Sequence, residues 1–140
     1  MNFLKASHLK SILIIALLAV MSSCNYTQSF PAKLNAQGAT IIDKIKNDNH
    51  FEEIQIQEKK SSGSGGNLTT LTVKLYNGKN LPADTVEVKK LGREIAGEIK
   101  PVLTDAGEIN SYIVLFCTRV IDGNTTNTNY NGYEYSSKEL

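Results

Sequence analysis

The sequence predicts a small α+β domain of the order α-β-β-α-β-(β), with a mainly antiparallel sheet and helices packed on one face. Two stretches carry apolar residues at helical spacing, and three others carry the alternating or continuously apolar pattern of strands. An antiparallel sheet with helices on one side is the simplest arrangement for this order of elements. The domain is predicted to cover residues 33–135.

The first predicted helix covers residues 33–47, and a hairpin of two strands follows it. The helix carries four apolar residues on one face, namely Leu34, Ile41, Ile42 and Ile45. In both strands apolar residues alternate with polar ones, first around Ile54 and then around Val73. Residues 61–66 contain only serine and glycine, so we expect a long, flexible tip between the strands.

The second helix is predicted to begin after Asp84 and to end before Pro101. Asp84 and Glu87 have the spacing of an N-terminal capping pair, and proline cannot continue a helix. One side of this helix is apolar, with Val88, Leu91, Ile95 and Ile99.

The C-terminal part of the chain predicts one central strand and a second strand beside it. Residues 112–121 are apolar on both faces, which is typical of a strand in the middle of a sheet. A turn at residues 122–124 leads into a stretch rich in Asn, Thr and Tyr. Either Thr126, Thr128 and Tyr130 or Tyr133 and Tyr135 are expected to form a fourth strand paired with the third. Residues 136–140 are expected to be disordered.

The first 24 residues have the parts of a secretory signal. Lys5 and Lys10 make the beginning positive, residues 12–21 are apolar without interruption, and two serines precede Cys24. A membrane-spanning helix needs roughly 20 apolar residues, so this run is too short to span. Residues 1–23 are therefore predicted to be a signal peptide.

The residues at the cut indicate a particular type of signal. Val20-Met21-Ser22-Ser23-Cys24 resembles the lipobox of bacterial lipoproteins, although Met21 stands where Leu is commoner. The Ser-Cys ending is similar to the looser lipoboxes of the Bacteroidota. The resemblance implies cleavage before Cys24, a diacylglyceryl group on its sulfur and an acyl chain such as palmitate on its amino group. One acyl chain anchors marginally and several anchor stably. An ordinary signal peptide with a chance cysteine is the alternative.

Residues 24–32 are predicted to be a tether between the membrane and the domain, because they are polar and end near a proline. Lipoproteins of the Bacteroidota that travel to the cell exterior often carry acidic residues after the cysteine, and this stretch has none. The resemblance therefore implies a cell-envelope protein on the outer membrane, facing the periplasm.

Charge and cysteine content narrow the function classes. The chain has 15 basic and 14 acidic side chains, and loss of Lys5 and Lys10 with the signal peptide leaves 13 basic against 14 acidic. This balance gives no long-range attraction to nucleic acid or to an anionic membrane. The chain has only two cysteines. If Cys24 carries lipid, Cys117 has no disulfide partner, and its apolar surroundings predict a buried, small hydrophobic side chain. A reactive thiol is the alternative.

No motif predicts a catalytic site, a metal site or a cofactor. His50 is the one histidine outside the signal, so it would have to serve as ligand or base together with Asp48 or Asp105. Ser61–Gly66 is glycine-rich but lacks the Gly-Lys-Ser/Thr ending of a phosphate-binding loop. We therefore expect a protein that is not an enzyme.

Two features favour a functional interpretation. Asp84-Thr85-Val86 resembles the motif for O-glycosylation of exported Bacteroidota proteins, with Thr85 as acceptor, and the helix cap described above is the alternative. Tyr130, Tyr133 and Tyr135 lie among asparagines, a composition suited to binding a glycan or a protein. An ordinary edge strand with aromatic cross-strand pairs is the alternative for them.

Together these observations predict a lipid-anchored, non-catalytic binding module for a protein or a polysaccharide. A narrower alternative is an inhibitor or immunity lipoprotein that neutralises a toxin or a hydrolase. A small envelope hydrolase is the remaining alternative, and it depends on His50.

Overall fold

In the part of the chain that the structure describes, five strands form one mixed sheet in the order β1-β2-β3-β4-β5, and two helices accompany it. The computed structural model describes residues 26–63 and 65–140, so the predicted signal peptide and Cys24 lie outside the described residues. The elements are β1 (Tyr26–Pro31), α2 (Gly38–Asp48), β2 (Glu53–Gly63), β3 (Gly66–Tyr76), α3 (Thr85–Ile99), β4 (Ser111–Asp122) and β5 (Thr125–Ser136). Short 3₁₀ turns at Lys100–Val102 and Ala106–Glu108 join α3 to β4.

The strand pairing follows from the connections. The neighbours β1–β2, β2–β3 and β4–β5 pair antiparallel, whereas β3 and β4 pair parallel, with Val73 opposite Val114. A parallel pair needs a long crossover, and α3 provides it. The predicted order lacked the first strand, and the expected antiparallel pairing does not extend to β3 and β4.

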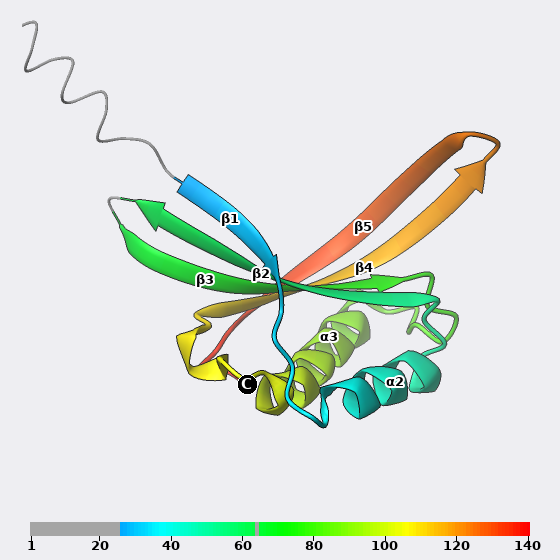
Figure 1. Cartoon of the computed structure of the whole chain (residues 1–140). Coiled ribbons are helices and arrows are strands. Elements are labelled where there is room, and N and C mark those ends of the chain that lie inside the picture. The colour runs from blue at the N-terminus through cyan, green and yellow to red at the C-terminus, as the bar shows by residue number, and fades with distance from the viewer. Residues whose placement is uncertain (1–25, 64) are drawn as a thin grey trace, which may run out of the picture.

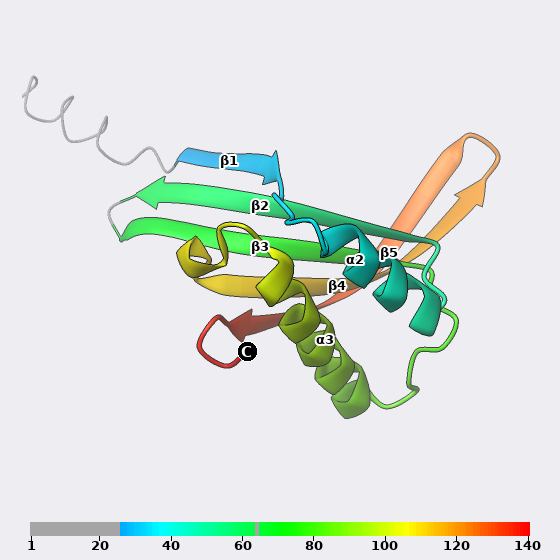
Figure 2. The ribbon, with the colours of Figure 1, turned by 60° about the horizontal axis from the view of Figure 1, so that its bottom comes forward.

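Both helices cover the same face of the sheet, and the opposite face is not covered by a helix (Figures 1 and 2). The core lies between the helices and the central strands, where alternate residues of β3 and β4 point toward the helices. Its most buried side chains are Ile45, Leu71, Val73, Leu75, Ile99, Tyr112 and Val114. This apolar layer explains why the central strands read as strands from sequence alone.

The segment predicted as a tether contains strand β1. Tyr26 pairs with Ser62 and Pro31 pairs with Gln57, so residues 26–31 belong to the sheet. All six side chains of β1 are exposed. A strand with no buried face shows no alternation of apolar and polar residues, which is why the sequence pattern missed it.

The chain ends also differ from the expectation. Residues 136–140 are not disordered: the Ser137 backbone N–H donates to the Asn110 carbonyl at 2.9 Å, and Leu140 packs against the core. The first helix starts at Gly38 instead of residue 33. Leu34 precedes it in an isolated bridge with Leu103.

The predicted start of the second helix is confirmed. Asp84 is the N-cap of α3, and its Oδ1 accepts a hydrogen bond from the Val86 N–H at 2.6 Å. The tip between β2 and β3 is shorter than expected, because the pairing continues to Gly63 and Gly66. Gly66 has a φ of 99°, a conformation that favours glycine.

Candidate partner-binding surface

The β4–β5 hairpin continues beyond the rest of the sheet. Tyr76, the last residue of β3, pairs with Cys117, and Cys117 pairs with Tyr130. Residues 118–129 therefore extend past the end of β3, and Tyr130 and Asn131 lie at the base of this extension. We call residues 118–131 the distal hairpin, and it projects away from both helices (Figures 1 and 2). Gly123 has a φ of 58°, which suits the first central position of a two-residue type II′ turn. The tight turn keeps the two strands paired to their ends, from Asp122 opposite Thr125.

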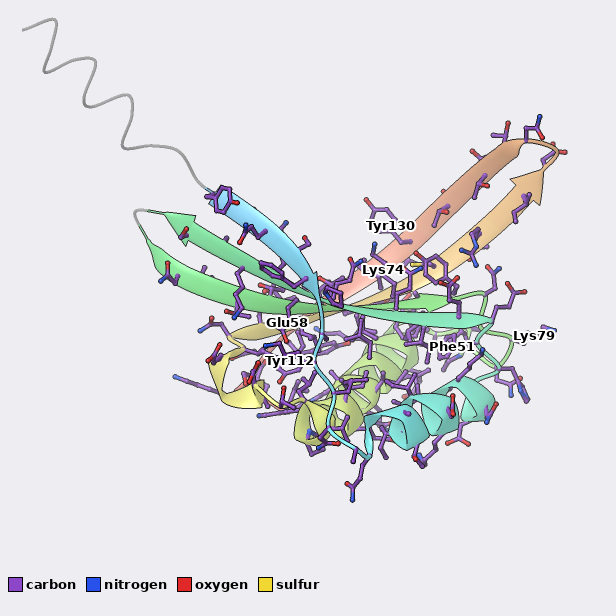
Figure 3. The ribbon with its side chains drawn as sticks, viewed as in Figure 1. Phe51, Glu58, Lys74, Lys79, Tyr112 and Tyr130 are labelled. Atoms are coloured by element: carbon purple, nitrogen blue, oxygen red, sulfur yellow. The ribbon has the colours of Figure 1, made fainter. Side chains whose placement is uncertain are left out.

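The distal hairpin exposes large apolar side chains. Ile121 is 70% exposed and Tyr130 is 69% exposed, and Val120 is also exposed. Ile121 lies opposite Thr126, and Tyr130 opposite Cys117, so both side chains share the face that the helices leave open. Figure 3 shows Tyr130 on that side of the sheet. Ile121 near the turn and Tyr130 at the base of the hairpin make its open face a candidate binding surface.

The three predicted tyrosines do not form one surface. Strand alternation places Tyr130 on the open face and Tyr133 and Tyr135 on the helix face. Tyr133 is half-buried, with its ring edge-on to that of Phe116 at 6.2 Å. Tyr135 is only 4% exposed. The prediction of a joint contact surface was therefore wrong, since Tyr135 belongs to the core.

The Tyr135 hydroxyl has a structural role. It donates a hydrogen bond of 2.6 Å to the Lys89 carbonyl of α3. Burial raises the pKa of this phenol to about 12. A Cβ atom on Gly92 would lie 2.5 Å from the same hydroxyl, so the glycine allows the helix to approach the strand. This contact ties the end of the chain to α3.

A groove of about 360 Å³ lies at the base of the distal hairpin, against the loop that leads into α3. It brings together two residues that the sequence singled out separately, Thr85 and Tyr133. Other groove residues are Leu81, Pro82, Phe116 and Asn131. The groove thus presents apolar side chains together with hydroxyl and amide groups.

Thr85 is exposed at the first position of α3, on the rim of this groove. Its neighbour Asp84 serves as the helix cap, which accounts for the Asp-Thr pair structurally. Glycosylation of Thr85 stays a prediction.

Sequence reasoning missed a polar cluster at the base of the distal hairpin. Arg119 contacts Glu53 through Nη2 and Oε2 at 2.8 Å, and its guanidinium lies 4.5 Å from the ring centre of Tyr76. A hydrogen bond from Gln55, followed by one from Arg119, lowers the pKa of Glu53. Asn77 also accepts from the Arg119 N–H at 2.7 Å. These groups are far apart in sequence, so no local pattern could reveal them.

The residues weighed for catalysis are not brought together. His50 lies just after the C-terminal end of α2, exposed and with a φ of 52°. Asp105 lies near Lys33, at the other end of α2, and Asp48 pairs with Lys44 at 3.2 Å. Within residues 26–63 and 65–140, no three His, Cys, Asp or Glu side chains gather closely enough to hold a metal ion.

Cys117 is buried, as the sequence predicted. Burial raises the pKa of its thiol, which keeps the unreactive protonated form.

Among the helices of the described residues, none is both long enough and apolar enough to cross a membrane. The chain matches no family model, no curated protein and no solved structure in the comparisons with known proteins.

Proposed function

We propose that this protein is a lipid-anchored envelope protein that binds a protein or polysaccharide without catalysis, and that the distal hairpin carries the binding surface. The observation that carries the proposal is the exposure of Ile121 and Tyr130 on a hairpin that projects beyond the helices. Such a hairpin can contact a partner without disturbing the core.

The position of β1 supports this arrangement. Tyr26 lies two residues after Cys24 and pairs with Ser62, close to the tip between β2 and β3. Two residues span about 7 Å at most. A lipid on Cys24 would therefore hold the β2–β3 tip near the membrane surface, with almost no tether between them.

The distal hairpin lies at the opposite end of the strands. From the position of Tyr26 to the turn at Gly123, the path along β3 and β4 is roughly 50 Å at about 3.3 Å per residue. The binding surface would then point away from the bilayer, into the periplasm if the anchor is in the outer membrane.

The composition of the distal hairpin favours a neutral, polar partner surface. Among residues 118–131, Arg119 and Asp122 are the only charged side chains. Asparagine amides and threonine hydroxyls form hydrogen bonds, and the Tyr130 ring can stack on a sugar or an apolar side chain. A narrow two-stranded projection also fits a cleft, which favours the alternative of an inhibitor or immunity lipoprotein.

The test uses a photoreactive phenylalanine analogue in place of Tyr130, in cells that make the full chain. Light should join the analogue to a specific envelope partner. The same analogue in place of Lys33, an exposed residue between β1 and α2, should capture nothing. A second experiment places the analogue at Ile121. Equal capture from Tyr130 and from the control position contradicts a binding hairpin, and so does the absence of capture from both Tyr130 and Ile121.

The anchor is tested separately by Cys24→Ser. The variant should leave the membrane fraction and lose the mass of the lipid. If it stays in that fraction, the anchor proposal is wrong.

A further inference from the structure

Among the strands that the structure describes, β5 is the last in the order and pairs with β4 alone, so its other backbone edge has no partner strand there. With a two-residue turn, Asp122 and Thr125 form a hydrogen-bonded pair, and such pairs then recur at every second residue. The backbone groups of Thr126, Thr128, Tyr130, Gly132 and Glu134 therefore point outward. An edge of this kind can accept another strand.

One hydrogen bond supports this assignment. The Ser136 N–H belongs to the outward set, and it donates to the Glu139 carboxylate at 2.9 Å. The chain thus covers the C-terminal end of its own edge and leaves the stretch from Thr126 to Glu134 open.

The open stretch lacks the usual protection of sheet edges. Residues 125–135 contain no proline and no lysine, and the pairing with β4 runs without a bulge. Glu134 is the one charged side chain among them. Proteins commonly block exposed edges with lysine, proline or bulges, so an unprotected edge of this length is unusual. The opposite edge strand, β1, is shorter and ends at Pro31.

A basic flank of α3 accompanies this edge. Lys89, Lys90 and Arg93 line a cleft of about 370 Å³ together with Glu134, Tyr135 and Glu139. Arg93 donates to the backbone carbonyl of Glu139, a neutral acceptor, so its charge is not cancelled there. On the other flank of α3, Glu98 pairs with Lys44 of α2 at 2.9 Å. The helix therefore presents positive charge toward the edge.

The three basic side chains of the cleft outnumber its two carboxylates, those of Glu134 and Glu139. The Glu139 carboxylate keeps its charge and accepts the Ser136 N–H at the C-terminal end of the edge. Glu134 lies opposite Ile113, and alternation directs its side chain to the face away from α3. The basic flank is thus open to acidic groups from another molecule.

We propose that β5 accepts an extended acidic segment of a partner protein as a sixth strand, which deepens the proposed binding function and rests on it. Where that segment passes Glu134 and Tyr135, its side chains on the helix side would meet Lys89, Lys90 and Arg93, so these positions are Asp or Glu. The others would lie beside Thr128 and Tyr130 on the open face and are uncharged.

A second copy of this chain fits less well. Its own β5 carries a single acidic residue, which cannot match the basic flank. Antiparallel pairing of two β5 strands relates the two copies by a two-fold axis between them. The N-terminal ends of the two β1 strands would then point in opposite directions. Two copies anchored in one membrane through Cys24 could not easily pair in this way.

The test measures fluorescence anisotropy of labelled nine-residue peptides added to the mature lipidated protein in detergent micelles. The first peptide alternates Glu with Val and Thr, and it should bind. A peptide with Lys in place of each Glu should not bind. A third peptide has the acidic sequence with N-methyl groups on the amides that would face β5, and it should lose binding because it cannot form the ladder.

Protein variants separate the two contributions. Lys89→Glu with Lys90→Glu should weaken binding of the acidic peptide about tenfold or more, as expected when close charge pairs become repulsive. Lys33→Glu with Lys79→Glu changes net charge equally, at exposed positions outside the cleft, and should retain most of the affinity. Thr128→Pro removes an outward N–H and should weaken binding while the melting temperature changes little.

Four results would overturn the inference. In the first, the N-methylated peptide binds as tightly as the unmodified acidic peptide. In the second, the Lys33→Glu, Lys79→Glu variant loses as much affinity as the Lys89→Glu, Lys90→Glu variant. In the third, sedimentation shows a dimer that Thr128→Pro dissociates. The fourth is capture of a partner from Tyr130 in the envelope while no acidic peptide binds, which leaves the proposed function intact and removes the sixth strand.

Discussion

Replacing Tyr135 by Phe keeps the buried ring and removes the hydroxyl that donates to the Lys89 carbonyl at 2.6 Å. A typical intramolecular hydrogen bond contributes about 1 kcal/mol net, so the variant should be less stable by about 1 kcal/mol at pH 7. For a domain of this size, that corresponds to a fall of about 4 °C in melting temperature.

The same variant should change the alkaline limb of stability. Burial raises the pKa of Tyr135 to about 12 in the folded protein, whereas the pKa of a tyrosine in the unfolded chain is about 10. The raised pKa means that the neutral form stabilises the fold. This contribution is complete below about pH 10 and is lost as pH rises toward about 12.

At pH 11, about one unit above the pKa of the unfolded phenol, the wild-type protein should have lost about 1.4 kcal/mol of stability through this residue. Tyr135→Phe has no hydroxyl there and should lose none of it. Urea unfolding followed by circular dichroism at pH 7, 9, 10 and 11 measures both proteins. The two stabilities should converge near pH 11. All other titratable groups are the same in both proteins, so their contributions cancel in the difference. A difference that stays constant from pH 7 to 11 would refute the role given to Tyr135.

Three further predictions concern the supports of the candidate surface. Gly92→Ala gains up to about 1 kcal/mol of helix propensity, but its Cβ would lie 2.5 Å from the Tyr135 hydroxyl. It should therefore destabilise the wild-type protein more than the Tyr135→Phe variant. A double-mutant cycle of unfolding free energies in urea measures this difference, and additive effects of the two substitutions would contradict the contact. Asp84→Ala should cost about 1 kcal/mol by loss of the α3 cap, read as a lower urea midpoint; an unchanged midpoint would show that the cap is unimportant. Because hydrogen bonds from Gln55 and Arg119 lower the pKa of Glu53, the ionised group stabilises the fold above its unfolded pKa of about 4. That contribution disappears as pH falls through the lowered pKa of Glu53. Below pH 4 the melting temperature of Glu53→Gln should therefore fall less steeply with pH than that of the wild type; parallel curves of melting temperature against pH would contradict the ion pair.

Much of the fold follows from local patterns. The capped start of α3 at Asp84, the apolar strand β4 and the turn at Gly123 were all readable, because each depends on residues near one another in the chain. The burial of Cys117 followed in the same way from its apolar neighbours. Strand β1 was not readable, since its side chains are all exposed and only pairing with β2 defines it.

The candidate surface was only partly readable. The sequence indicated Tyr130, Tyr133 and Thr85, and two of these line the groove. It did not separate Tyr130 from Tyr135, because alternation needs a known register before it assigns faces to a core and to solvent. It also could not place Lys89 and Arg93 beside the edge of β5, about forty residues later in the chain.

The sequence by itself therefore determined the helices, the central strands, the turns and the candidate anchor at Cys24, since these depend on short-range spacing and composition. The tertiary structure alone decided the parallel pairing of β3 with β4, the exposure of the distal hairpin and the basic cleft beside β5. These depend on which distant segments meet when the apolar faces of the helices and the sheet are buried against each other, and no short stretch of sequence records that choice.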